Sequence, residues 1–255
     1  MFADDHIINQ RDQISSYLKQ TYNINIESLP YYNNFSASML KCIVSFKLWS
    51  GMLERKDAVS NGSLQYLKET ISNLNQVLVL GILGFKSPSF SMIRRSLENI
   101  ISFIYFKDHP IEFAKKQMDP EFKNLSVKEM GDYIKQYPFS YYYNTEQGNL
   151  INQFTSQIMG LWKIEYQELS KFVHGSNDKY FDLNSFIEEI NPNDDILIKI
   201  EKHILIFSSI VNTLNILFFF DLYKSEISEE EKQFIRRAIT QDGYKRTIQD
   251  IFGEI

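Results

Sequence analysis

This chain has few of the residues that cross-link or interrupt a fold. Cysteine occurs once, at Cys42, which excludes an intramolecular disulfide framework and suits a reducing compartment. Proline occurs six times and glycine ten times in 255 residues, which excludes collagen-like and low-complexity proteins. Basic residues are not in excess, since 27 against 32 acidic residues gives a formal net charge of −5. A globally basic nucleic-acid-binding surface is therefore excluded, although a local basic patch is not.

The chain also lacks a long uninterrupted hydrophobic run. Its most apolar stretch, 204–220, is shorter than the ~20 apolar residues that a membrane-spanning helix needs. That stretch also contains five polar residues, which are Ser208, Ser209, Asn212, Thr213 and Asn215. We therefore expect a buried core helix there. The N-terminus is acidic and lacks the basic start and apolar core of a secretory signal, so we predict a cytoplasmic protein with no membrane partner.

Apolar residues make up 44% of the chain, and their spacing is helical. Leu64, Leu67, Ile71, Leu74 and Leu78 recur at intervals of three and four, and no stretch sustains the alternation of a strand. The pattern predicts an all-α fold, a multi-helix bundle of roughly eight to ten helices. We expect one domain over 1–255, with a core motif region at about 89–176 and C-terminal helices over 194–255.

Polar residues mark the expected starts of two helices. Ser89 or Ser91, after a proline, is a suitable N-cap for a helix that is apolar over most of its circumference. A helix of that kind is usually surrounded by others. Asp194 or Asp195 is the expected N-cap of a long helix that reaches Tyr223.

Further along the chain, separate helices are expected over 149–159 and 162–174. Gly175 is well placed to end the second of them in the left-handed conformation. Ser228 and Glu231 lie three residues apart, which predicts a capping box at the start of another helix.

Motifs for common cofactors and nucleophiles are missing. The sequence contains no glycine-rich phosphate loop, dinucleotide-binding fingerprint or Gly-x-Ser-x-Gly elbow. Cys42 lies in an apolar helical segment, where cysteine is typically an inert small hydrophobe. The four histidines are far apart, and none has a second histidine one helical turn away. We therefore predict no metal site and no cofactor.

One segment that stands out is 93–101, where charged residues interrupt an apolar helix. Arg94 and Glu98 are four residues apart and Arg95 and Glu98 three apart, so either arginine can reach the carboxylate on the helix surface. A charge on a buried helix is costly unless it is paired and hydrogen-bonded. A neighbouring element must therefore meet these charges, or they must line a wet cleft.

The second segment is 166–175. Tyr166, Ser170 and His174 are spaced by four and form a polar line beside an apolar packing stripe. His174 falls in the last turn of the expected helix, where free carbonyl groups favour the protonated ring. An imidazole next to a glycine at a helix end is a reasonable position for acid–base chemistry.

We expect the two segments to fold together, and two interpretations of such a cluster stay open. Arg95, Glu98, Ser170 and His174 form either a satisfied polar cluster that fixes how two central helices pack or a ligand-binding or catalytic site. If the cluster is structural, Arg95→Ala and His174→Ala should each lower the melting temperature by several degrees.

At these residues the chain resembles a group of prokaryotic helical proteins related to the HEPN superfamily. The matching residues are Arg95, Ser96 and Glu98 and, some seventy residues later, Tyr-x-x-Leu-Ser-x-x-Val-His-Gly over 166–175. The resemblance implies a helical bundle with an HEPN-like core, dimerisation, and an RNA-cleaving site at the dimer cleft. Active members of the superfamily carry an arginine shortly before the histidine on the same helix. This chain has Gln167, Glu168 and Leu169 there instead, which argues against cleavage.

The resemblance supports two hypotheses of function. In the first, the chain is a non-catalytic sensor, scaffold or regulatory component of a defence or mobile-element system, acting as a homodimer or with a partner protein of that system. In the alternative, it is a metal-independent ribonuclease, a toxin or antiphage effector. His174 would then be the general acid or base and Arg95 would stabilise the developing charge, with RNA as the partner. The aromatic stretch 141–143 would offer surfaces for stacking bases. A small-ligand pocket between helices is a third candidate.

Overall fold

The computed structural model describes residues 2–22, 26, 29–59, 61–119, 121–122, 125–175, 178–180 and 189–253. In these ranges the chain is helical and has no strand, which confirms the predicted all-α bundle. The twelve α-helices of the described ranges are α1 (Phe2–Tyr22), α2 (Tyr32–Arg55), α3 (Asn61–Ile82), α4 (Lys86–Asp108), α5 (Pro110–Met118), α6 (Val127–Lys135), α7 (Phe139–Tyr142), α8 (Thr145–Val173), α9 (Asp194–Phe218), α10 (Phe220–Glu226), α11 (Glu229–Ala238) and α12 (Asp242–Phe252).

Two short helices account for the difference from the expected eight to ten. α7 has four residues and α10 has seven, and the other helices have nine or more. Helices of one or two turns leave too little periodicity to be recognised in a sequence. The expected core motif region at about 89–176 runs from the first turn of α4 to just beyond α8, and its last residue, Ser176, lies outside the described residues.

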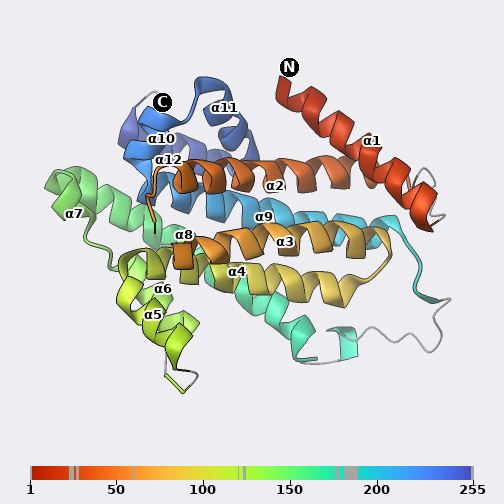
Figure 1. The fold of residues 1–255 in the computed structure, drawn as a ribbon, viewed down its shortest axis with the longest axis horizontal. Coiled ribbons are helices and arrows are strands. Elements are labelled where there is room, and N and C mark those ends of the chain that lie inside the picture. Colours follow the sequence, from red (N-terminus) through yellow and green to blue (C-terminus); the bar gives the residue numbers. More distant parts are fainter. Residues whose placement is uncertain are drawn as a thin grey trace.

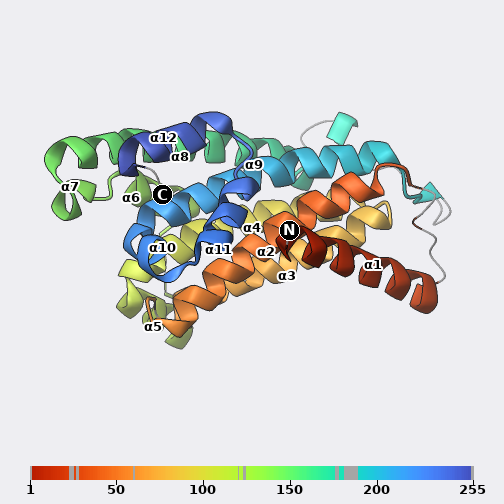
Figure 2. The same ribbon diagram turned by 90° about the horizontal axis from the view of Figure 1, so that it is seen from above.

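The long helices α2, α3, α4 and α9 lie side by side, and α8 passes along them (Figure 1). The view from above shows α8 and α12 along one side of the bundle and α3 and α1 towards the other (Figure 2). α4 packs against α3, α6, α8 and α9. Most of its apolar residues are fully buried, including Ile93, Leu97, Ile100, Ile101 and Ile104. The expectation of a surrounded central helix is therefore confirmed.

The start of α4 differs from the prediction. The helix begins at Lys86, so Pro88 lies inside its first turn, where a proline is tolerated because the backbone N–H groups have no intrahelical partner. Ser89 and Ser91 are consequently helical residues rather than N-caps. Their hydroxyls donate back to the carbonyls of Phe85 and Ser87, at 2.6 and 3.0 Å.

α8 is one continuous helix of 29 residues, where we expected two helices. Gly160 lies between the two expected segments and does not interrupt the helix, and a Cβ built there would meet nothing within 4 Å. Gly175 follows the helix with φ of +54°, as predicted for a left-handed ending.

The helix after residue 193 is capped and ended differently from the prediction. Its N-cap is Asn193, whose side chain accepts a hydrogen bond from the Ile196 backbone at 2.9 Å, and neither of the expected aspartates fills this role. α9 ends at Phe218, and the chain bends by 88° into α10, so no single helix reaches Tyr223. The capping box of Ser228 and Glu231 at the start of α11 is confirmed.

Among the described residues, no single helix is both long enough and apolar enough to cross a bilayer. α9 and α10 pass the criterion only when they are taken together, on length and composition alone, and they are sharply bent relative to each other. α9 is largely buried among the other helices, as expected for a core helix.

Candidate functional site

The two segments that stood out in the sequence meet where α4 packs against α8. Arg94 points from α4 towards α8, where its Nε donates to the Ser170 hydroxyl at 3.0 Å and its Nη2 donates to the Tyr166 hydroxyl at 2.6 Å. The same Nη2 lies 3.0 Å from a carboxylate oxygen of Glu98, one turn along α4. We call these four residues, Arg94, Glu98, Tyr166 and Ser170, the Arg94 cluster.

Further contacts complete the hydrogen bonding of the Arg94 cluster. The Tyr166 hydroxyl donates to Glu98 at 2.9 Å, and the Ser170 hydroxyl donates to the Tyr166 carbonyl at 2.7 Å. The guanidinium carbon of Arg94 also lies 4.8 Å from the centre of the Tyr166 ring. Burial raises the pKa of Tyr166, and its hydrogen bond to Glu98 acts in the same direction, so the phenol remains a neutral donor. The cluster is thus a satisfied network of the kind that fixes how two helices pack.

Arg95 does not belong to this cluster, contrary to the expectation. Its side chain is 58% exposed, against 21% for Arg94, and its Nε donates to Glu69 of α3 at 2.7 Å. Successive helical residues are turned by about 100°. The two arginines therefore face different neighbours, and it is Arg94 that faces α8.

His174 does not join the cluster either. It is the exposed C-cap residue of α8, and its backbone N–H donates to the Ser170 carbonyl at 3.0 Å. Its ring makes no hydrogen bond or ion pair with any residue that the structure describes. The predicted cluster of an arginine, a carboxylate and an imidazole is therefore corrected to an arginine, a carboxylate, a phenol and a serine hydroxyl.

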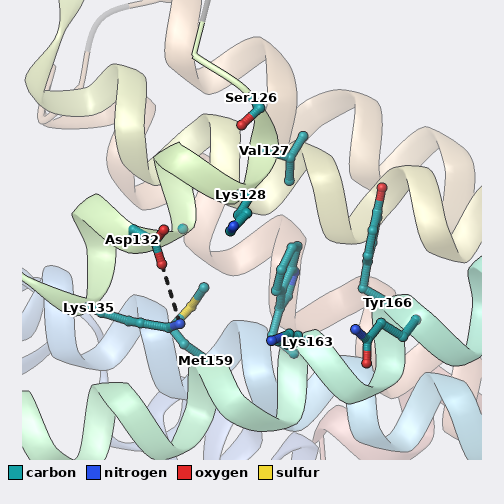
Figure 3. A pocket seen from close by; sticks show the side chains of 11 residues that line it. Ser126, Val127, Lys128, Asp132, Lys135, Met159, Lys163 and Tyr166 are labelled. Carbon is teal, nitrogen blue, oxygen red and sulfur yellow. Dashed lines mark hydrogen bonds and ion pairs between the residues drawn. The ribbon is translucent and has the colours of Figure 1, made fainter.

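A pocket of about 440 Å³ lies beside this cluster, between α6 and α8. Figure 3 shows Lys128, Asp132 and Lys135 from α6 opposite Met159, Lys163 and Tyr166 from α8. Val127, Gly131 and Trp162 also line it. Of these residues only Tyr166 stood out in the sequence, because a pocket between two helices was expected without its position.

An aromatic pair forms one wall of the pocket. The rings of Trp162 and Tyr166 are stacked with centres 5.1 Å apart and planes 12° apart. The Trp162 indole N–H donates to the carbonyl of Leu97 on α4 at 3.1 Å. Tyr166 is held by the Arg94 cluster. Hydrogen bonds to residues of α4 hold both rings, so this wall of the pocket is already in place without a ligand.

A second buried polar pair joins α8 to α9. The His203 ring is hydrogen-bonded to the Glu165 carboxylate, and both residues are buried. Phe90 of α4 packs edge-on against the His203 ring, with centres 4.9 Å apart. This buried histidine is therefore satisfied by a carboxylate rather than solvated. Among the described residues, no group of three or more histidine, cysteine or acidic side chains could hold a metal ion.

The single cysteine is in the core. Cys42 is buried in α2, and burial raises the pKa of its thiol to about 12. A thiol in this state is a poor nucleophile, because the thiolate is the reactive form. The interpretation of Cys42 as an inert hydrophobic residue is therefore supported.

Comparison with known proteins adds no family to this picture. No family model, no curated protein and no solved structure matches this chain. The resemblance to HEPN-related proteins therefore depends on the residues of the two segments alone.

Proposed function

We propose that this chain is a non-catalytic sensor, scaffold or regulatory component of a prokaryotic defence or mobile-element system. The observation that carries this proposal is the Arg94 cluster, in which the charged groups of the two motif segments bind each other. The Nε and Nη2 groups of Arg94 already bind Ser170, Tyr166 and Glu98 within the protein. A charge-stabilising catalytic group must instead present its donors to the reacting atoms.

The residues outside the cluster also fit a non-catalytic role. A general acid or base is normally held in place by a neighbouring group. His174 has no such partner among the described residues, and Arg95 is engaged by Glu69. The sequence also lacks the arginine that precedes the histidine in active HEPN ribonucleases.

A component of this kind needs a partner, and we propose a homodimer or a partner protein of the same system. The exposed apolar residues Ile111 and Met118, 72% and 86% exposed at the two ends of α5, are available for such a contact. Sedimentation equilibrium tests the homodimer, for which the expected mass is twice 30.1 kDa. A monomer at all concentrations would contradict it.

The alternative is a metal-independent ribonuclease, and one observation favours it. His174 is exposed, so a phosphate of an RNA could reach it, whereas the exposed Tyr141 and Tyr142 lie at the other end of α8. This function would need His174 and Arg95 to act on the same phosphate.

Incubation of the full chain with single-stranded RNA in the presence of a chelator separates the two functions. We expect no cleavage above that of His174→Ala and Arg95→Ala. Cleavage by the unmodified protein that His174→Ala abolishes, at an unchanged melting temperature, would overturn the non-catalytic proposal and establish the ribonuclease.

A further inference from the structure

The pocket between α6 and α8 has an apolar interior and a cationic edge. Val127, Met159 and Trp162 supply apolar surface. Lys128, Lys135 and Lys163 supply positive charge, against one carboxylate, Asp132. The chain as a whole is acidic, with a net charge of −5, so the positive charge at this edge is opposite in sign to the net charge of the protein.

Two of these lysines have no hydrogen-bond or ion-pair partner among the residues that the structure describes. Lys135 lies 3.5 Å from Asp132, at the far limit of a hydrogen bond. Lys128 and Lys163 form no hydrogen bond or ion pair with the residues that the structure describes. They come from different helices and line the same opening (Figure 3). An anion at this edge can therefore be met from two sides without displacing an existing ion pair.

The volume and the aromatic wall of the pocket restrict which apolar group a bound anion can have. A volume of about 440 Å³ is in the range of small-molecule sites. The Trp162 and Tyr166 rings are nearly parallel, and each is hydrogen-bonded to α4. A rigid aromatic wall favours a flat apolar group, which loses little conformational freedom on binding.

We propose that the α6–α8 pocket binds a small organic anion with a flat apolar body. The body lies against Trp162 and Met159, and the anionic group lies between Lys128 and Lys163. Such a ligand would be an input for a sensor, but the site is independent of whether the chain is a sensor or a ribonuclease. Because Tyr166 also belongs to the Arg94 cluster, an occupant of the pocket contacts the residue that joins α8 to α4.

The probe is 8-anilino-1-naphthalenesulfonate, a fluorescent flat aromatic sulfonate, titrated into the folded full chain. We expect saturable binding at one site and quenching of tryptophan fluorescence. Gly131→Leu should weaken binding about tenfold or more, because its side chain projects into the pocket from a position whose Cβ would lie 3.3 Å from Met159 Cε. Gly160→Leu is the matched control on α8, since a Cβ there meets nothing within 4 Å, and it should bind as the unmodified protein does.

The charge is tested separately, with variants that leave the helix interiors unchanged. The double variant Lys128→Gln/Lys163→Gln should weaken binding of the sulfonate about tenfold. It should leave the binding of uncharged N-phenyl-1-naphthylamine unchanged. Lys199→Gln/Lys202→Gln, on the exposed side of α9, is the control and should have no effect.

Three results would overturn the proposal. They are no saturable binding of the sulfonate, equal binding by Gly131→Leu and Gly160→Leu at equal melting temperatures, and equal loss of the charged and uncharged probes in the lysine double variant. If Gly131→Leu is destabilised, the lysine variants alone decide, since exposed lysines are replaced without loss of packing.

Discussion

Two adjacent arginines of α4 have different surroundings. The Arg94 side chain is 21% exposed and contacts three side chains of the Arg94 cluster, whereas Arg95 is 58% exposed and pairs with Glu69 at the surface. A partly buried, fully hydrogen-bonded charge is worth much more than an exposed pair, which is screened by water. The effects of substituting the two adjacent arginines on stability can therefore be compared directly.

Replacing each arginine by alanine should give very different stabilities. We expect Arg94→Ala to lower the free energy of unfolding by about 2 kcal/mol, since Glu98 and Tyr166 lose a charged partner. Arg95→Ala should change it by less than about 0.5 kcal/mol. Urea unfolding followed by circular dichroism measures both. Equal effects of the two substitutions would contradict the geometry of the cluster.

The sequence indicated most members of the cluster but not which arginine belongs to it. The spacing of Arg94 and Glu98, and of Tyr166 and Ser170, predicted that each pair shares a helix face. α4 is apolar nearly all round, so no polar side shows which face meets α8. Only the packing of two segments distant in sequence settles that. His174 continues the spacing of four, but at the exposed C-cap of α8 its ring has no partner in the cluster.

At the scale of elements, interruptions were the hardest features to predict. The break expected between residues 159 and 162 does not occur, and the helix expected to reach Tyr223 ends at Phe218, where neither proline nor glycine gives a signal. The Phe219 ring packs near Phe103 and Trp49, with centres 5.7 and 6.5 Å apart. Tertiary packing of this kind overrides local preference and leaves no local pattern.

Alanine substitutions at Gly160, inside α8, and at Gly175, just after it, should change the free energy of unfolding in opposite directions. Gly160 lies inside the helix with open space at its Cβ, so Gly160→Ala should raise the free energy of unfolding by about 0.5 to 1 kcal/mol. Gly175 has φ of +54°, so Gly175→Ala should lower it by about 1 kcal/mol. Thermal and urea unfolding of both variants check this. A stabilising Gly175→Ala would show that the left-handed ending is wrong.

At the scale of the whole molecule, the fold class followed from periodicity, whereas the pocket did not. Lys128 and Lys135 are seven residues apart on α6, and Trp162 and Tyr166 four apart on α8, so each pair shares a helix face. That signal was present in the sequence. That α6 and α8 face each other, however, depends on the path of the intervening chain, which no short pattern encodes.

The buried phenols and thiol predict how stability depends on alkaline pH. Burial raises the pKa of Tyr32 and of Tyr143 to about 12, from 10.0, and that of Cys42 to about 12, from 9.0. As the pH rises through 9 to 10, these groups lose protons first in the unfolded chain, which then binds fewer protons than the folded chain. Stability must therefore fall as the pH rises from about 9 towards 12.

Melting temperatures recorded from about pH 7 to about pH 11 test this dependence, which linkage makes steepest above the ordinary tyrosine pKa. Tyr32→Phe should flatten the alkaline decline, and Tyr141→Phe, at an exposed position, should not. A melting temperature that stays constant to about pH 11 would mean that these groups are not buried in the folded chain.

Arg94 and Tyr166 bind each other and thereby hold α4 against α8. A double-mutant cycle with Arg94→Met and Tyr166→Phe, followed by urea unfolding, measures this contact. We predict a coupling free energy of about 1 kcal/mol, in the range found for residues in one hydrogen-bonded network. Additive effects of the two substitutions, with a coupling indistinguishable from zero, would contradict the account.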